Sequence, residues 1–189
     1  KVWLEYLSWQ EKRHSLKPVD ANFRDKCSGW EMFSLSLGFQ DGTTCSTRLN
    51  EDYYMRAFLQ NYSLRDSCYQ CSFKKQNRVS DLTIGDLWGI NDILPELNDN
   101  KGVSVIFVQS NKGQRILQSI ENQMRLKQID SKLAIEHNGA MTHSAFRQPM
   151  RDYFYSKIGK KDFGALVEEV FHPTMKTRIE RKLLQCWNK

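Results

Sequence analysis

Met32-Phe-Ser-Leu-Ser-Leu-Gly-Phe-Gln40 is followed by Asp41-Gly42 and then by Thr43-Thr-Cys-Ser-Thr-Arg-Leu49. In the first run, apolar side chains alternate with small or polar ones, which is the period of a strand with one buried face. Asp-Gly is a preferred turn sequence, and the Thr-rich segment after it has the composition of a return strand. The sequence therefore predicts a β-hairpin over residues 32–49, and this hairpin decides the class of fold.

Helical patterns surround the hairpin. Residues 1–14 have the apolar spacing of an amphipathic helix, and Asn50 is a suitable N-cap for a helix that ends at Gln60. The other expected elements are short strands at 22–26, 82–84 and 133–135, a buried strand at 103–108, and helices at 110–126, 142–158, 161–171 and 173–187. Residues 90–102 are expected to form a polar loop. This order predicts an α+β (irregular α/β) fold, in which a small mixed sheet with the hairpin packs against several helices and the C-terminal part is helical. We expect a single domain over residues 1–189.

The composition is that of a globular protein. Of the 189 residues, 40% are hydrophobic and 12% aromatic, which argues against a disordered chain. No apolar run approaches the roughly 18 residues that a membrane span needs. The formal net charge is +6, with the excess concentrated in residues 147–189. No nucleic-acid-binding motif accompanies these charges, so they are interpreted as a solvated helix surface and no nucleic-acid partner is expected.

The five cysteines do not have the spacing of a secreted disulfide framework, which favours a reducing, cytoplasmic compartment. Cys27, Cys45 and Cys186 stand alone in the sequence and are expected to be buried or inert thiols. Lys1 already lies within a helical pattern. We therefore expect the chain to be the C-terminal domain of a longer protein.

The segment 64–89 reads Leu-Arg-Asp-Ser-Cys-Tyr-Gln-Cys-Ser-Phe-Lys-Lys-Gln-Asn-Arg-Val-Ser-Asp-Leu-Thr-Ile-Gly-Asp-Leu-Trp-Gly. The thiolates of Cys68 and Cys71 are two residues apart, so both can bind one metal ion or cluster from a single turn. A zinc ribbon would need a second such pair, and a thioredoxin-like redox pair would need a βαβ context, neither of which the sequence provides. Structural or incidental thiols are the alternative that the residues alone leave open.

The end of this segment combines glycines, carboxylates and an indole. Gly85 and Gly89 permit positive φ and a close approach to a ligand, Asp81 and Asp86 can accept hydrogen bonds, and Trp88 offers a stacking face. These features fit a turn that faces a cofactor. They also fit a structural turn whose carboxylates satisfy loop N–H groups, or a divalent-metal site, for which two oxygen donors are a weak signal.

Four basic residues lie around the cysteine pair: Arg65, Lys74, Lys75 and Arg78. Positive charge lowers the pKa of a neighbouring thiol and can bind a phosphate group. A solvated basic loop explains Lys74 and Lys75 equally well, so Arg65 and Arg78 are the stronger candidates.

Together these residues resemble the C-terminal domain of the coenzyme F(420) hydrogenase/dehydrogenase beta-subunit family, in the branch with a Gly-Asp-x-Trp-Gly run. The resemblance spans most of the chain and is carried by Arg65, Ser67, Cys68, Cys71, Phe73, Arg78, Ser80, Asp81, Leu82, Thr83, Gly85, Asp86, Trp88 and Gly89, with flanking matches at 22–26, 29–30, 51–58 and 101–104.

The resemblance implies an iron–sulfur site and a flavin site. Cys68 and Cys71 would bind a 4Fe-4S cluster whose remaining ligands lie outside this chain, in an N-terminal ferredoxin-like domain. The second cofactor would be FAD or a related flavin, or the deazaflavin coenzyme F(420), contacted by Arg65, Arg78, Asp81, Gly85, Asp86, Trp88 and Gly89. This branch is similar to proteins of bacteria that lack the deazaflavin, which favours a flavin. Other redox subunits are the implied partners.

The leading hypothesis is therefore an electron-transfer domain of an oxidoreductase subunit, with no catalytic residue of its own and no turnover as an isolated chain. The alternative is a non-catalytic interaction or scaffold domain of a polysaccharide-biosynthesis protein associated with pyruvyl transferases. A nucleotide-sugar enzyme that uses Asp81 and Asp86 has little support beyond the two carboxylates.

Overall fold

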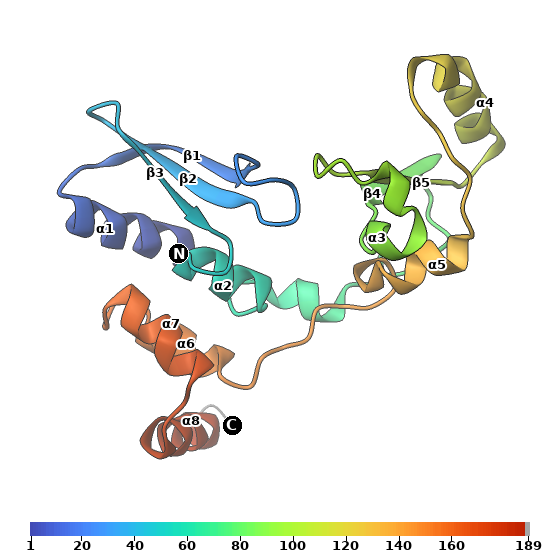
Figure 1. Cartoon of the computed structure of the whole chain (residues 1–189). Coiled ribbons are helices and arrows are strands. Elements are labelled where there is room, and N and C mark those ends of the chain that lie inside the picture. The colour runs from blue at the N-terminus through green and yellow to red at the C-terminus, as the bar shows by residue number, and fades with distance from the viewer. Residues whose placement is uncertain (188–189) are drawn as a thin grey trace. The chain divides into compact units, whose positions relative to one another are not determined.

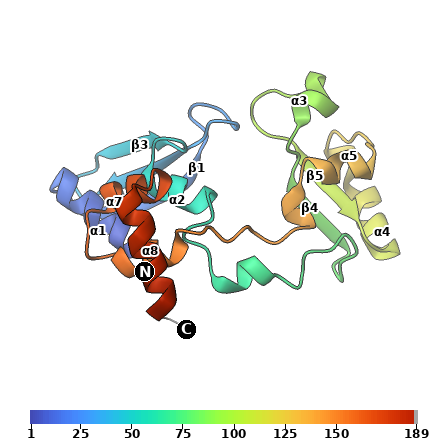
Figure 2. The same cartoon turned by 90° about the horizontal axis from the view of Figure 1, so that it is seen from below.

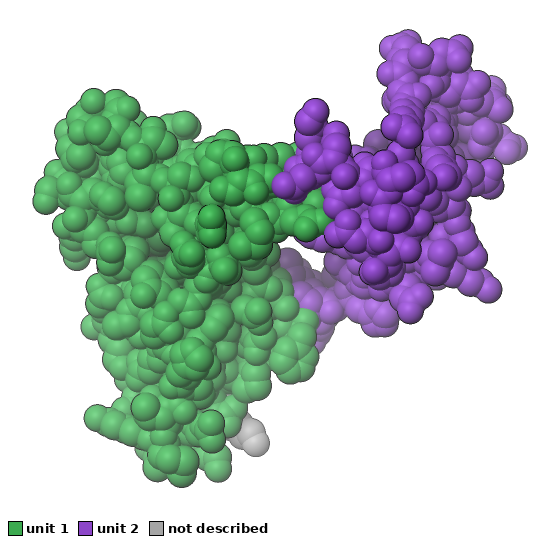
Figure 3. Space-filling view, in the orientation of Figure 1, with its two compact units in different colours: residues 1–66, 146–189 green, residues 67–145 purple. Residues whose placement is uncertain are grey.

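The computed structural model describes residues 1–187, with side chains described through residue 184. The chain forms two compact units, residues 1–66 with 146–189 (unit 1) and residues 67–145 (unit 2) (Figure 1, Figure 3). Each unit combines helices with a small antiparallel sheet, which confirms the predicted α+β class, although the described strands form two antiparallel sheets and not the one mixed sheet that was expected.

The sheet of unit 1 contains the predicted hairpin. Strand β2 (Ser34–Phe39) lies between β1 (Pro18–Asp25) and β3 (Thr44–Arg48), and both pairings are antiparallel. At the turn, the Asp41 carboxylate accepts a hydrogen bond from the Thr43 amide over 3.0 Å, and Gly42 has φ 86°. The turn residues therefore act as their types predict. Strand β1 is longer than the expected strand over residues 22–26.

Five helices complete unit 1: α1 (Val2–His14), α2 (Tyr53–Leu59), α6 (Arg151–Lys157), α7 (Phe163–Phe171) and α8 (Met175–Trp187). Helices α1, α2 and α7 lie together on one side of the sheet (Figure 1, Figure 2). Leu35 and Leu37 from β2 pack in one cluster with Tyr6, Phe154 and Leu166 from the helices. This cluster is the main hydrophobic core of unit 1.

A buried polar network links α1 to the start of α2. The Tyr6 hydroxyl donates to Asp52 Oδ2 over 2.5 Å and accepts from Gln10 Nε2 over 2.7 Å. Asp52 Oδ1 accepts from the Met55 amide over 2.8 Å, so Asp52 is the N-cap of α2. The network satisfies polar groups that burial would otherwise leave without partners.

Unit 2 is built around strands β4 (Leu82–Asp86) and β5 (Ser104–Val108), which pair antiparallel. Its α-helices are α3 (Ile90–Ile93), α4 (Asn111–Ile120) and α5 (Ser131–Glu136). Its short 3-10 helices are η2 (Pro95–Leu97), η3 (Glu121–Gln123) and η4 (Gly139–Met141), while η1 (Asp66–Gln70) begins at the last residue before the unit. A small core gathers Leu87, Ile90, Val105 and Ala134.

Several expected elements are wrong in type or length. Residues 133–135 belong to α5 rather than to a strand, because Asp130 caps a helix there by accepting from the Lys132 amide over 2.8 Å. The expected helix over residues 142–158 begins only at Arg151, after Pro149, whose missing N–H and fixed φ oppose an earlier start. Residues 90–102 contain α3 and η2 instead of an open loop.

Other differences concern length and burial. Strand β5 is less buried than expected, since only Val105 of its residues is buried. Helix α4 ends at Ile120, earlier than predicted, and a 3-10 turn follows. Cys27 is exposed and Cys45 partly buried, and both are free, so the expectation of burial is wrong for Cys27; the side chain of Cys186 lies outside the described residues. Within residues 1–187, every helix is too short or too polar to cross a membrane.

Candidate functional site

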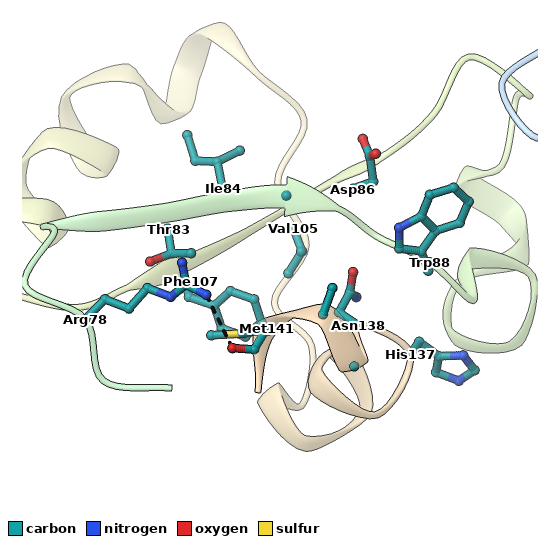
Figure 4. Close-up of a pocket in the computed structure, with 13 residues that line it drawn as sticks. Arg78, Thr83, Ile84, Asp86, Trp88, Val105, Phe107, His137, Asn138 and Met141 are labelled. Carbon is teal, nitrogen blue, oxygen red and sulfur yellow. Dashed lines mark hydrogen bonds between the residues drawn. The ribbon is translucent and has the colours of Figure 1, made fainter. Parts of the chain in front are cut away.

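A cavity of about 350 Å³ lies against the β4–β5 pair of unit 2 (Figure 4). Its strand wall includes Thr83, Gly85, Val105 and Phe107. The register pairs Thr83 with Phe107 and Gly85 with Val105, so these four positions share one face of the sheet. Ligand pockets usually occupy about 300–1,000 Å³, so this cavity can hold a ring-sized group.

The opposite wall comes from the segment that follows α5. Five consecutive residues of this segment line the cavity: His137, Asn138, Gly139, Ala140 and Met141. The last three form η4. This wall is about fifty positions later in the sequence than β4. Sequence reasoning missed it, although Asn138-Gly139 is a turn signal that ends the preceding element.

Four of the residues predicted as cofactor contacts line this cavity: Arg78, Gly85, Asp86 and Trp88. Arg78 lies at one end, with Trp88 and His137 at the other (Figure 4). The Arg78 guanidinium donates to the carbonyl of Met141 over 3.3 Å through Nη2 and to the carbonyl of Lys75 over 3.3 Å through Nε. These bonds fix a cation at the rim of the cavity.

Trp88 and Gly85 give the cavity room and a stacking surface. The Trp88 side chain is 42% exposed, so part of its ring remains available for contact. A Cβ built on Gly85 would meet no atom within 4 Å, and no positive φ requires glycine at this position. The glycine therefore leaves open space, and neither packing nor backbone strain explains it.

Gly89 supports the cavity without lining it. It has φ 77° and is the N-cap of α3, and a Cβ on it would lie 2.2 Å from Nδ1 of His137. Real Cβ atoms do not approach another atom so closely, so a side chain at this position would displace the imidazole, and the positive φ also favours glycine. Gly89 thus connects the Gly-Asp-x-Trp-Gly run to the wall that follows α5.

Asp81 holds the start of α4 and is not among the lining residues. Its carboxylate accepts a hydrogen bond from Ser110 Oγ over 2.5 Å, and Lys112 Nζ lies 3.3 Å from Oδ2. The bond from Ser110, followed by the contact with Lys112, lowers the pKa of the Asp81 carboxyl. Ser110 is in turn the N-cap of α4, accepting from the Gly113 amide over 3.1 Å.

The cysteine loop is hydrogen-bonded to the segment that ends the cavity wall. The Cys68 carbonyl accepts from the Ala145 amide over 3.1 Å, and the Cys71 amide donates to Ser144 Oγ over 2.9 Å. Lys74 Nζ donates to the carbonyl of Ala140, which lines the cavity. The loop over residues 68–78 is therefore attached at several points to residues 140–145.

Cys68 and Cys71 are the candidate metal ligands of unit 2. Cys68 and Cys71 are both free and partly exposed. Among residues 1–187, no group of three or more His, Cys, Asp or Glu side chains could hold a metal ion. A 4Fe-4S cluster uses four thiolates, so these residues fit half of such a site and do not complete it.

Arg65 stands apart from the other predicted site residues. It is exposed and belongs to unit 1, whereas residues 68–89 belong to unit 2. Nearby in unit 1, the buried Arg151 donates to the Leu64 carbonyl over 2.8 Å and lies 3.1 Å from Asp66. Within unit 2, the structure brings Arg78, Gly85, Asp86 and Trp88 together at one cavity.

The fold and site define an α+β chain with a paired-thiol loop attached to the wall of a ring-sized cavity. The chain belongs to the family described as the C terminus of the coenzyme F420 hydrogenase/dehydrogenase beta subunit, whose model matches residues 7–132. This confirms the family that the cysteine pair and the Gly-Asp-x-Trp-Gly run predicted. No curated protein and no solved structure matches the chain.

Proposed function

We propose that this chain is the cofactor-contacting, C-terminal domain of an iron–sulfur and flavin oxidoreductase subunit. The observation that carries the proposal is the shared segment 140–145, which is hydrogen-bonded to the cysteine loop and includes residues of the cavity wall. A redox protein needs its centres close together and held by rigid surroundings. Membership in the family supports the same assignment.

Cys68 and Cys71 are the proposed thiolates for a 4Fe-4S cluster. Two further thiolates must come from outside this chain, from a ferredoxin-like domain of the same protein or from another redox subunit. Bound there, the cluster would carry one electron at a time. The role of the chain's residues is to fix the loop, since the Cys71 amide is bonded to Ser144 and the Cys68 carbonyl to the Ala145 amide.

The cavity is the proposed site for the ring of a flavin-type cofactor, which would exchange electrons with the cluster. Trp88 offers a stacking face, and Arg78 provides a fixed cation for a ring oxygen or an anionic group. A volume of about 350 Å³ is at the low end for ligand pockets, so the cavity suits the ring portion of FAD rather than the whole dinucleotide.

We further propose a reducing, cytoplasmic compartment for the protein. Cys27, Cys45, Cys68 and Cys71 are all free, and the proposed ligand pair binds iron only as reduced thiolates. No observation favours the scaffold function that the sequence left open as an alternative.

The test is anaerobic purification of the full-length protein, with iron, sulfide and visible absorption measured for the wild type and for Cys68→Ser/Cys71→Ser. We expect a brown, iron-containing wild type and a colourless double variant. Cys27→Ser is the matched control, because Cys27 is exposed and lies outside the loop, and it should retain the iron of the wild type. Equal iron in the wild type and the double variant would remove this pair from the ligand set.

The flavin part has its own test, since the cavity lies entirely within unit 2. FMN is titrated into the wild type and into Trp88→Ala, and the quenching of flavin fluorescence is followed. We expect saturable binding by the wild type and binding about fivefold weaker by Trp88→Ala, because a stacking contact is worth about 1 kcal/mol. Absence of saturable binding by the wild type would refute the flavin site.

A further inference from the structure

His137 has an unusual position in the cavity wall. It is the C-cap residue of α5, and its amide donates to the carbonyl of Leu133 over 3.3 Å, so the end of the helix fixes its backbone. His137 is among the lining residues, at the same end of the cavity as Trp88, and its imidazole extends away from the strand wall (Figure 4). The family match ends at residue 132, so His137 lies beyond the matched region.

The imidazole of His137 occupies the space that a side chain at position 89 would fill. A Cβ on Gly89 would lie 2.2, 2.4 and 2.6 Å from Nδ1, Cγ and Cε1 of His137. Three ring atoms at this range mean that the ring lies directly over the Gly89 Cα, and any other residue would have to displace it. Gly42 provides a comparison, because it has a similar φ of +86° but nothing within 4 Å of its Cβ position.

The two ring nitrogens of His137 have different surroundings, because Nδ1 lies against the Gly89 backbone and Nε2 is not among the ring atoms nearest to it. Neither is hydrogen-bonded to any side chain or backbone group within the described part of the chain. The residue is only partly buried, which leaves Nε2 as the ring nitrogen that can reach a ligand.

We propose that His137 is a ligand-contacting residue of this cavity and that Gly89 is the positioning residue that seats its imidazole. The remaining lining defines the ligand class. Trp88 and Phe107 are flat apolar surfaces, and Arg78 is a cation at the opposite end from His137. The ligand is therefore a planar aromatic ring system with hydrogen-bonding groups at two separated edges. This inference rests on the proposed flavin site and assigns one of its edge contacts to His137.

The binding test uses FMN as the probe and the whole chain as the protein. His137→Phe keeps a ring of similar size but loses both nitrogens, whereas His137→Gln keeps a hydrogen-bonding group. We expect FMN binding to be about tenfold weaker for His137→Phe and to recover most of that loss in His137→Gln. His172→Phe is the matched control, since His172 is exposed, belongs to unit 1 and does not line the cavity, and its affinity should equal that of the wild type.

The outcomes separate the two proposals. If the wild type binds no FMN, the flavin site and the role of His137 both fall. If the wild type binds FMN and His137→Phe binds it equally well, the flavin site stands and only the role of His137 is lost.

The positioning role is tested without any ligand. Urea unfolding is compared for Gly89→Ala, His137→Ala and the double variant, with Gly42→Ala as a measure of the cost of positive φ alone. We expect Gly89→Ala to lower the midpoint more than Gly42→Ala, and His137→Ala to recover the excess when it is added to Gly89→Ala. Equal losses for the two glycine variants, or no recovery in the double variant, would overturn the positioning role. Should Gly89→Ala not fold, recovery of a folded double variant is the same test.

Discussion

Ser144 Oγ accepts a hydrogen bond from the Cys71 amide over 2.9 Å, although the two residues are 73 positions apart in the sequence. The bond joins the loop that carries both candidate iron ligands to the segment that follows η4. Residues 71–81 lie between η1 and β4 and belong to no helix or strand, so their conformation depends on such bonds.

Ser144→Ala should loosen the cysteine loop. The Cys71 amide loses its acceptor, and a hydrogen bond of this kind contributes about 1 kcal/mol. We expect a small fall in the free energy of unfolding, measured with urea, and faster loss of iron to a chelator from the full-length protein. Ser119→Ala is the control, because the Ser119 hydroxyl donates only to the Ile116 carbonyl of its own helix. An iron-release rate equal to that of the control would show that Ser144 does not restrain the loop.

Gly85 and Gly113 should respond in opposite ways to an added side chain. Gly85→Val should leave stability nearly unchanged, because nothing lies within 4 Å of its Cβ position, yet it should weaken FMN binding by filling the cavity. Gly113→Ala should destabilise the protein by about 1–3 kcal/mol, since its Cβ would lie 2.2 Å from the Asp81 carbonyl oxygen, a backbone atom that cannot move freely. This cost exceeds the roughly 1 kcal/mol that alanine gains in helix propensity.

Urea unfolding and FMN titration of both variants check this pair. A Gly85→Val variant that unfolds early would show that the space beside Gly85 is needed for folding rather than for a ligand. Unchanged stability of Gly113→Ala would mean that α4 can shift away from Asp81.

Ser110→Ala should destabilise unit 2 through the start of α4. The change removes the N-cap bond to the Gly113 amide, which is worth about 1 kcal/mol, and the donor to Asp81. The hydrogen bond from Ser110 is the main cause of the lowered pKa of Asp81. The stabilisation of the folded state by this bond is therefore present above the ordinary carboxyl pKa of about 3.9, and it is lost as pH falls through the lowered pKa. The penalty of Ser110→Ala should therefore shrink in strong acid. A penalty that stays constant from neutral pH to strong acid would contradict the Asp81 contact.

The opposite pH dependence is expected for Asp52. Burial raises the pKa of its carboxyl, while the hydrogen bonds from Tyr6 and from the Met55 amide oppose that shift. The folded state therefore holds the Asp52 proton more tightly than the unfolded state. Its contribution favours folding most below the ordinary carboxyl pKa of about 3.9 and declines as pH rises through the raised value.

Asp52→Asn, which cannot ionise, should remove this pH dependence while keeping two bonds, the N-cap bond through its one oxygen and a bond to the Tyr6 hydroxyl in which Nδ2 now donates. Asp52→Ala loses both and should cost about 2–3 kcal/mol at neutral pH. Urea unfolding of the three proteins from acid to neutral pH is the measurement. If the free energies of unfolding of the wild type and Asp52→Asn change in parallel over the whole pH range, the pKa of Asp52 is not raised.

The local parts of the fold were determined by the sequence itself. Alternation of apolar residues and the Asp41-Gly42 turn specify the β2–β3 hairpin, because strand period and turn chemistry depend on neighbouring residues. The identity of the family also followed from local residues, since the cysteine pair and the Gly-Asp-x-Trp-Gly run are contiguous. The short apolar run at 133–135 was misread as a strand because three residues cannot distinguish the two periods, and the Asp130 cap decides for a helix.

Tertiary structure alone decided which of the predicted cofactor-contacting residues lie at the same cavity. It placed Asp81 at α4 and Arg65 in unit 1, and it added His137, which no local pattern distinguished from an ordinary surface histidine. The cavity needs two walls from segments about fifty positions apart. Their meeting depends on packing, such as the fit of the His137 ring over Gly89, and packing between distant segments leaves no periodic trace in a single sequence.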